Sequence, residues 1–149
     1  MPSSFLSECK QKVLNRIESL LVNKDQITSS MRYSALADSK CIRAGLVFAA
    51  GKLEGQLDEV GLTDIATSME LMHYYSLIHD DLPAMDDDGM RRGQLSNHVK
   101  FNEATAILAG DALQALAFES IASSKSITDA HKVEAVRMLA AACGHQGMV

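Results

Sequence analysis

The chain has 149 residues, 47% hydrophobic and 22% charged, with a net charge of -5. This length suits one domain with a sizeable core, and the negative charge argues against a nucleic-acid binder, because recognition of a phosphate backbone needs a clustered basic surface. The three cysteines are widely spaced and form no CxxC pair, which predicts free thiols in a reducing compartment, the cytoplasm. No stretch reaches the roughly 20 apolar residues of a membrane span, and the first residues lack the apolar core of a signal peptide.

Helical periodicity is the main secondary-structure signal. Apolar residues recur every three or four positions and predict helices over residues 4–23, 28–51, 64–81, 103–123 and about 129–144. Asp64 is the expected N-cap of the third helix, and Pro83, which disfavours the α conformation at the preceding residue, is expected to end it near Asp81. The fourth helix is apolar nearly all round, which predicts a buried core helix. No strand pattern alternates with period two, so the expected fold class is all-α.

Five aspartates and two arginines crowd into residues 80–92, directly after the third predicted helix. On a straight helix Asp80 and Asp86 would point in divergent directions, whereas a break at Pro83 lets the following loop fold back so that both face one ion. Oxygen ligands without cysteine favour Mg²⁺ or Ca²⁺ over zinc, and the neighbouring arginine pair suits a phosphate or diphosphate. The pattern predicts a metal-diphosphate site, with a solvated acidic surface as the alternative.

The chain resembles the trans-isoprenyl diphosphate synthases of the polyprenyl synthetase family, most closely the bacterial farnesyl type, through residues 72–86, 91–93 and 101–113. These segments join a DDxxxxD metal motif, an arginine pair and a helix signature in the order that this family uses. The resemblance implies an all-α helical bundle of the isoprenoid synthase type around a deep cavity. It also implies a prenyltransferase that condenses isopentenyl diphosphate with an allylic diphosphate, dimethylallyl or geranyl, to farnesyl diphosphate with Mg²⁺.

The resemblance implies which side chains bind the metal and the allylic substrate. The aspartates of the DDxxxxD motif would be catalytic and bind Mg²⁺, and they are Asp80, Asp81 and Asp86. Arg91 would contact the allylic diphosphate. Magnesium and arginine together would neutralise the negative charge that develops on the departing diphosphate as its carbon–oxygen bond breaks.

The same resemblance implies four side chains that hold isopentenyl diphosphate, namely Lys40, Arg43, His73 and Arg92. Tyr75 lies five residues before the first aspartate of the motif, where the family places the floor that stops the growing chain. A bulky aromatic residue at this position, together with the two extra residues inside the metal motif, implies a farnesyl product and not a longer one.

The chain departs from the family pattern in one segment and in length. Where the family normally has Gly-Gly-Lys-Arg-x-Arg-Pro, residues 38–44 read Asp-Ser-Lys-Cys-Ile-Arg-Ala. We expect a different backbone turn there, and Asp38 adds a carboxylate that opposes an anionic substrate. Family members are much longer and carry a second aspartate-rich motif in the half that is missing here. Residues 1–149 are therefore expected to be the N-terminal part of a single domain and to be inactive alone.

Two non-enzymatic hypotheses stay open beside that of a homodimeric enzyme. The altered residues 38–44 and the early stop also suit a truncated, non-catalytic relative that binds a partner or a diphosphate. A plain helical interaction module would instead need an exposed apolar stripe as its main surface. The intact run of aspartates and arginines over residues 80–92 favours the enzyme.

Overall fold

The computed structural model describes residues 2–149, with side chains from Ser4 onward. The described residues form helices and one short hairpin, which confirms the predicted all-α class. In chain order the elements are α1 (Pro2–Leu20), α2 (Gln26–Ala35), α3 (Ile42–Glu54), α4 (Glu59–Asp80), β1 (Met90–Arg91), β2 (Gln94–Leu95), α5 (Asn97–Lys100), α6 (Glu103–Ala122) and α7 (Asp129–Cys143).

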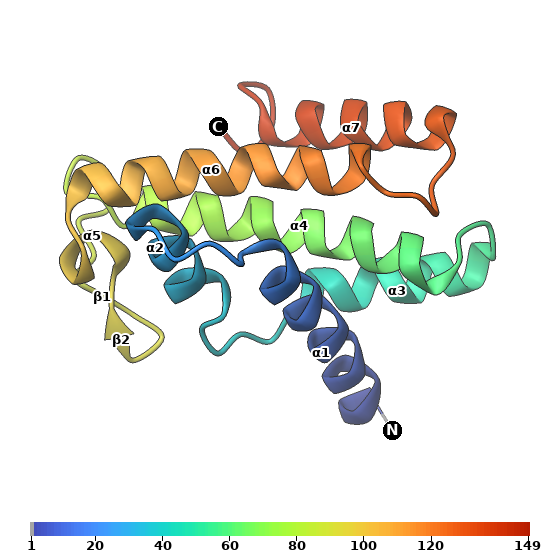
Figure 1. The fold of residues 1–149 in the computed structure, drawn as a ribbon, viewed down its shortest axis with the longest axis horizontal. Coiled ribbons are helices and arrows are strands. Elements are labelled where there is room, and N and C mark those ends of the chain that lie inside the picture. The colour runs from blue at the N-terminus through green and yellow to red at the C-terminus, as the bar shows by residue number, and fades with distance from the viewer. Residues whose placement is uncertain (1) are drawn as a thin grey trace.

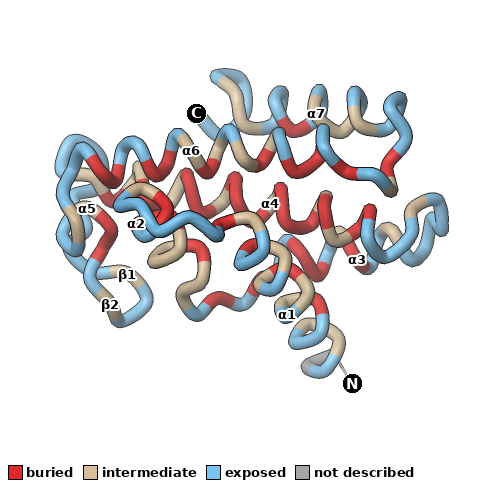
Figure 2. The backbone as a smooth tube through the Cα atoms, in the orientation of Figure 1, coloured by how far each residue is buried: buried red, intermediate tan, exposed pale blue. Residues whose placement is uncertain are grey.

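Helices α4 and α6 lie side by side at the centre of the molecule (Figure 1). Helix α7 packs on α6, α1 and α3 pack on α4, and α2 contacts both central helices near the end that carries α5 and the hairpin. Burial is concentrated on α4 and on the sides of its neighbours that face it (Figure 2). The largest fully buried side chains include Val13, Ile17, Phe48, Leu71, Tyr74, Ile78 and Leu113. The most buried helix thus leads directly into the acidic loop, residues 80–88.

The predicted helix over residues 28–51 is wrong, because the structure has two helices, α2 and α3, separated by residues 36–41. Cys41 adopts a left-handed φ of 44°, a conformation in which the Cβ atom crowds the backbone and a right-handed helix cannot continue. The connection also contains Asp38 and Ser39, whose side chains favour turns by bonding to nearby backbone groups. The break lets α3 pack against both α1 and α4.

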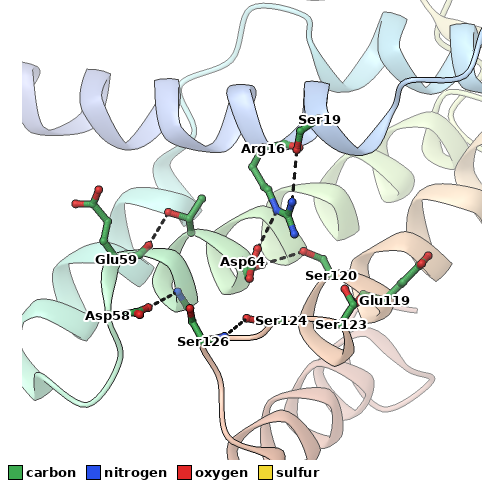
Figure 3. Close-up of polar contacts among 12 residues, drawn as sticks. Arg16, Ser19, Asp58, Glu59, Asp64, Glu119, Ser120, Ser123, Ser124 and Ser126 are labelled. Carbon is green, nitrogen blue, oxygen red and sulfur yellow. Dashed lines mark hydrogen bonds and ion pairs between the residues drawn. The ribbon is translucent and has the colours of Figure 1, made fainter.

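The predicted capping role of Asp64 is also wrong. Helix α4 begins at Glu59, and its N-cap is Asp58, whose side chain accepts the Gly61 N–H at 2.8 Å. Asp64 lies inside the helix, where its nearly buried carboxylate pairs with the Arg16 Nε atom at 2.9 Å. The Ser120 hydroxyl donates to the Asp64 carbonyl at 3.4 Å (Figure 3). These contacts join α1, α4 and α6 at a buried charge, which needs such a partner.

Helix α6 was predicted to be covered on all sides, and the structure corrects this. Its inner side packs on α4 and α2, but Ile107 and Leu108 are 42% and 53% exposed. Among the described helices, α6 has the length and apolar composition that would suffice to cross a membrane. The core helix of a soluble protein meets the same criterion, and α2, α4, α5 and α7 all pack against α6.

Candidate functional site

The acidic loop folds back on the end of helix α4, as the sequence predicts. Helix α4 ends at Asp80, with Asp81 as its C-cap, and Pro83 follows in the loop. The Asp86 N–H then donates to the Asp80 carbonyl at 2.8 Å, and the Asp87 N–H donates to the Leu82 carbonyl at 3.1 Å. The proline break therefore returns the third aspartate of the motif to the backbone of the first.

The side chain of Asp81 is held by arginine. Arg91 Nε lies 2.9 and 2.8 Å from the two carboxylate oxygens of Asp81, and Arg91 Nη2 donates to one of them at 2.6 Å. Asp81 is only 2% exposed, so the guanidinium supplies the counter-charge that a buried carboxylate requires. Hydrogen bonding to Asp81 raises the pKa of Arg91 above its ordinary value.

The three aspartates of the motif do not converge on one point. Within residues 2–149, no group of three or more His, Cys, Asp or Glu side chains is arranged to hold a metal ion. Asp86 is exposed and Asp80 is half-buried, whereas the Asp81 carboxylate is turned to Arg91. The oxygen-only donor set still suits Mg²⁺, provided that Arg91 releases Asp81.

Both arginines of the motif lie on the hairpin, which the sequence did not predict. Strands β1 and β2 pair antiparallel, with Met90 opposite Leu95 and Arg91 opposite Gln94. The two residues between the strands, Arg92 and Gly93, have φ of 52° and 81°. Positive φ at both central residues is typical of a type I′ turn, which matches the twist of two-residue hairpins. Gly93 was a sequence signal for this turn. It was missed because arginine stands before it, where such turns usually have asparagine or aspartate.

A cavity of about 710 Å³ opens between α1, the start of α3 and the middle of α4. We call it the basic pocket. It brings together the four side chains predicted to hold isopentenyl diphosphate, and these are Lys40, Arg43, His73 and Arg92. Arg92 also donates from Nη1 to the Asp38 carbonyl at 3.4 Å, so the hairpin reaches the edge of the pocket. Segments far apart in the sequence thus meet in one cavity that is rich in cations.

The electrostatics of the basic pocket favour an anion. Burial, together with the positive charges of Arg43, Arg92 and Arg91, lowers the pKa of His73 to about 4. His73 is therefore neutral at physiological pH and can donate a hydrogen bond without adding charge. Burial raises the pKa of Glu70, while the Ala44 amide and the two arginines of the pocket act against that rise.

The sequence did not identify Lys10 and Glu70, which also line the basic pocket. Glu70 lies three residues before His73, a spacing that places both on one side of a helix, so the signal was present. No sequence signal links Lys10 to the site. Its Nζ atom lies 2.7 Å from an Asp38 carboxylate oxygen, and this contact lowers the pKa of Asp38. The expected repulsion between Asp38 and an anion is thereby offset by Lys10.

Tyr75 lies outside the basic pocket and is 8% exposed. Its ring meets the ring of His79 edge to face, with centroids 5.3 Å apart. The His79 Nε2 atom lies 3.0 Å from the Ile107 carbonyl of α6. A Cβ atom at Gly110 would collide with this imidazole, so the glycine leaves the space that His79 occupies. Contacts from α6 therefore hold the ring against which Tyr75 packs.

Comparison with known proteins identifies the family. The sequence pattern described as Polyprenyl synthetase matches residues 24–147. The chain belongs to the polyprenyl synthetase family. This membership confirms the resemblance found in the sequence, and it accounts for the helical bundle.

Individual members of the polyprenyl synthetase family show the extent of the match. A farnesyl diphosphate synthase of Haemophilus influenzae is 46% identical over 122 residues, which cover 82% of this chain and 41% of the relative. A geranylgeranyl pyrophosphate synthase of Arabidopsis thaliana is also 46% identical, over 124 residues, covering 83% and 35%. The crystal structure of a geranyltransferase from Legionella pneumophila superposes with a TM-score of 0.93 at 42% identity, covering 99% of this chain and 54% of that one. The chain thus spans about half the length of such relatives or less.

Proposed function

We propose that this chain is the N-terminal part of a trans-prenyltransferase that joins isopentenyl diphosphate to an allylic diphosphate. The observation that carries the proposal is the basic pocket, in which Lys40, Arg43, His73 and Arg92 line one cavity. A diphosphate carries several negative charges, and the cationic side chains of Lys40, Arg43 and Arg92 with the neutral imidazole donor of His73 complement it. The acidic loop contacts the same hairpin through the Asp81–Arg91 ion pair, which supports a second, metal-dependent diphosphate site.

We assign the diphosphate of isopentenyl diphosphate to the basic pocket. Arg43 and Arg92 offer planar forks that can bind phosphate oxygens in pairs, and Lys40 adds a third charge. His73 would donate a hydrogen bond in its neutral form, because its pKa is about 4. Binding an anion offsets the repulsion from the arginines, so the pKa of His73 is expected to rise when the pocket fills.

We assign the allylic diphosphate and magnesium to the acidic loop. Asp80, Asp81 and Asp86 would hold Mg²⁺, since their oxygens are the ligands that this ion prefers. Held there, the ion would supply Lewis-acid stabilisation of the charge on the departing diphosphate. Asp81 becomes available only when Arg91 leaves it, and the released guanidinium would then turn to the allylic diphosphate. The buried Asp81 carboxylate would thereby keep a counter-charge, since Mg²⁺ would take the place of Arg91.

The product class rests on Tyr75. Two relatives of equal identity carry farnesyl and geranylgeranyl names, so overall similarity does not determine chain length. Tyr75 is a large aromatic side chain held against His79, and a rigid ring of this size suits a floor that stops elongation early. We therefore propose farnesyl diphosphate as the product.

We further propose that the enzyme is a cytoplasmic homodimer whose second aspartate-rich motif lies in a segment outside these 149 residues. The three cysteines are free thiols, in keeping with a reducing compartment. This chain covers only 41% and 35% of the length of two relatives, which supports the proposal that it contributes only some of the active-site residues.

A binding experiment tests the pocket directly. Inorganic pyrophosphate is titrated into the 149-residue chain by calorimetry, and Arg43→Ala should weaken its binding about tenfold or more, since a charged hydrogen bond contributes about 1.5–3 kcal/mol. Lys24→Ala, an exposed cation outside the pocket, is the matched control and should leave the affinity unchanged. Equal affinities of wild type and Arg43→Ala would reject the pocket assignment.

A turnover assay distinguishes a prenyltransferase from a non-catalytic relative. The 149-residue chain alone should show no prenyl transfer from geranyl diphosphate to isopentenyl diphosphate, because the second aspartate-rich motif that we propose lies outside it. The gene product with the second aspartate-rich motif should be active. If the chain binds pyrophosphate but the complete gene product is inactive, the hypothesis of a non-catalytic relative is favoured. The ion pair between Asp81 and Arg91 is compatible with that hypothesis as well.

A further inference from the structure

Helix α3 begins at the wall of the basic pocket without a cap of its own. Its N-cap residue, Cys41, has a φ of 44° and makes no side-chain hydrogen bond to the helix. The first N–H groups of any helix lack partners within the helix, and the N-cap side chain usually accepts from one of them. Arg43 lies in this first turn and lines the pocket. Whatever caps α3 therefore also places Arg43.

The cap comes from another helix. Glu70 of α4 accepts the Ala44 N–H through its Oε1 atom at 3.0 Å. Glu70 is 2% exposed, and it lines the basic pocket one turn before His73. A carboxylate at a helix N-terminus is favoured by the helix dipole as well as by the hydrogen bond. The contact fixes the start of α3 against α4, next to the arginine that faces the cavity.

Glu70 also brings negative charge to a pocket that otherwise attracts anions. Glu70 lines the same cavity as Arg43 and Arg92, and their positive charges act on its carboxylate through space, so its negative charge offsets part of theirs before a ligand arrives. An anion that enters the pocket meets the same two arginines and is repelled by Glu70. The carboxylate therefore has two opposite effects, since it positions Arg43 and weakens the field that Arg43 exerts.

We propose that Glu70 is the positioning residue of the basic pocket, where its oxygen caps helix α3 to hold Arg43 in place and its charge limits the affinity for diphosphate. The proposal rests on the proposed function, in which this pocket receives the diphosphate of isopentenyl diphosphate. Limited affinity has a functional consequence. A diphosphate-containing molecule held too tightly would leave the site slowly after each reaction cycle.

Two substitutions of similar size separate the two effects. Glu70→Gln keeps a carbonyl oxygen that can accept the Ala44 N–H and removes the charge. Glu70→Met removes the charge and the acceptor. Calorimetric titration with inorganic pyrophosphate should show about threefold to tenfold tighter binding by Glu70→Gln than by wild type at low salt, with a smaller difference at high salt. Glu70→Met should bind about tenfold more weakly than Glu70→Gln, because the helix start is no longer held.

Amide hydrogen exchange of Ala44 reports the cap without any ligand. Its N–H should be protected in wild type and Glu70→Gln and should exchange faster in Glu70→Met. Glu54→Gln, which removes an exposed carboxylate at the other end of α3, is the control and should resemble wild type in both experiments.

Each outcome has a distinct meaning. Equal pyrophosphate affinity of Glu70→Gln and Glu70→Met, or unchanged exchange at Ala44 in Glu70→Met, overturns the capping role. Binding by Glu70→Gln that is no tighter than wild type overturns the role of the charge. Absence of pyrophosphate binding by wild type, with the exchange pattern intact, rejects the proposed diphosphate pocket and leaves the cap of α3 as a purely structural contact.

Discussion

Arg91 and Asp81 form a forked ion pair, in which two guanidinium nitrogens contact both oxygens of a buried carboxylate at 2.6 to 2.9 Å. Asp81 is the second aspartate of the DDxxxxD motif, and Arg91 is the first of the two arginines that follow it. The side chain proposed to bind magnesium is therefore already occupied by a cation from the protein itself. Guanidinium and metal compete for the same oxygens, and several of the expected outcomes below depend on that competition.

Arg91→Met should destabilise the protein by about 3 kcal/mol, because it leaves the Asp81 carboxylate buried without a counter-charge. Urea denaturation measures the change. Arg137→Met is the control, since the ion pair of Arg137 with Glu134 is exposed and such pairs contribute about 0–1 kcal/mol. Combining Arg91→Met with Asp81→Leu should recover most of the loss. Failure of the double variant to do so would show that the pair has another structural role.

Divalent cations should stabilise Arg91→Ala more than wild type. Without the guanidinium, Asp81 is free to join Asp80 as a ligand, whereas in wild type the ion must first displace Arg91. The measurement is the rise in melting temperature on adding Mg²⁺ in the absence of diphosphate. Asp81→Ala introduced into the Arg91→Ala background should abolish the extra rise. Equal responses of Arg91→Ala and wild type would contradict competition at this carboxylate.

In the complete enzyme that we propose, Asp80→Ala should lower prenyl-transfer turnover by about 10²–10³-fold, the usual effect of losing one electrostatic stabiliser of a transition state. Asp88→Ala removes an exposed carboxylate of the same loop that lies outside the DDxxxxD motif, and it should retain nearly full activity. Stability of both variants is checked by denaturation. A near-normal rate for Asp80→Ala would reject the metal assignment.

The native protein should lose stability as pH falls from about 6.5 to about 4, and His73 should account for part of the loss. His73 has a pKa of about 4 in the folded protein, and an unperturbed histidine has a pKa of 6.5, so the unfolded chain binds more protons between these values. The full difference corresponds to about 3 kcal/mol, which partial exposure reduces to about 1–2 kcal/mol.

The pH dependence is measured by urea denaturation at pH 7 and near pH 4.5. His73→Gln should show a smaller loss than wild type, while His131→Gln, at an exposed position, should behave as wild type. A loss of the same size in His73→Gln would mean that His73 is not held neutral by its surroundings.

Gly110→Ala should destabilise the protein by about 1–3 kcal/mol, the usual cost of overpacking, although alanine is the better helix former. The reason is that the new methyl group would collide with the imidazole of His79. Gly89→Ala is the control, because a Cβ atom there meets nothing within 4 Å and the glycine has no positive φ. Loss of the His79 contact should also disturb the Tyr75 ring, which near-ultraviolet circular dichroism detects. Equal stability of the two variants would mean that the His79 imidazole does not lie against Gly110 in solution.

The sequence allowed the fold class, the end of α4 at the proline and the returning loop to be predicted, because each depends on local rules of periodicity and proline geometry. The division of residues 28–51 into two helices could not be seen, since it depends on the left-handed Cys41 and on distant Glu70, which caps α3 by accepting the Ala44 N–H. The pairing of Asp64 with Arg16 is equally non-local. The meeting of Lys40, Arg43, His73 and Arg92 followed from the family resemblance and not from any spacing between them.

The hairpin that carries Arg91 and Arg92 has a consequence for the order of events at the site. Side chains of neighbouring residues in an extended segment project in different directions. Here Arg91 reaches Asp81, while Arg92 borders the basic pocket. Because Arg91 and Arg92 are adjacent at this two-residue turn, we expect withdrawal of Arg91 from Asp81 to shift Arg92. Occupancy of either diphosphate site that we propose would then alter the affinity at the other.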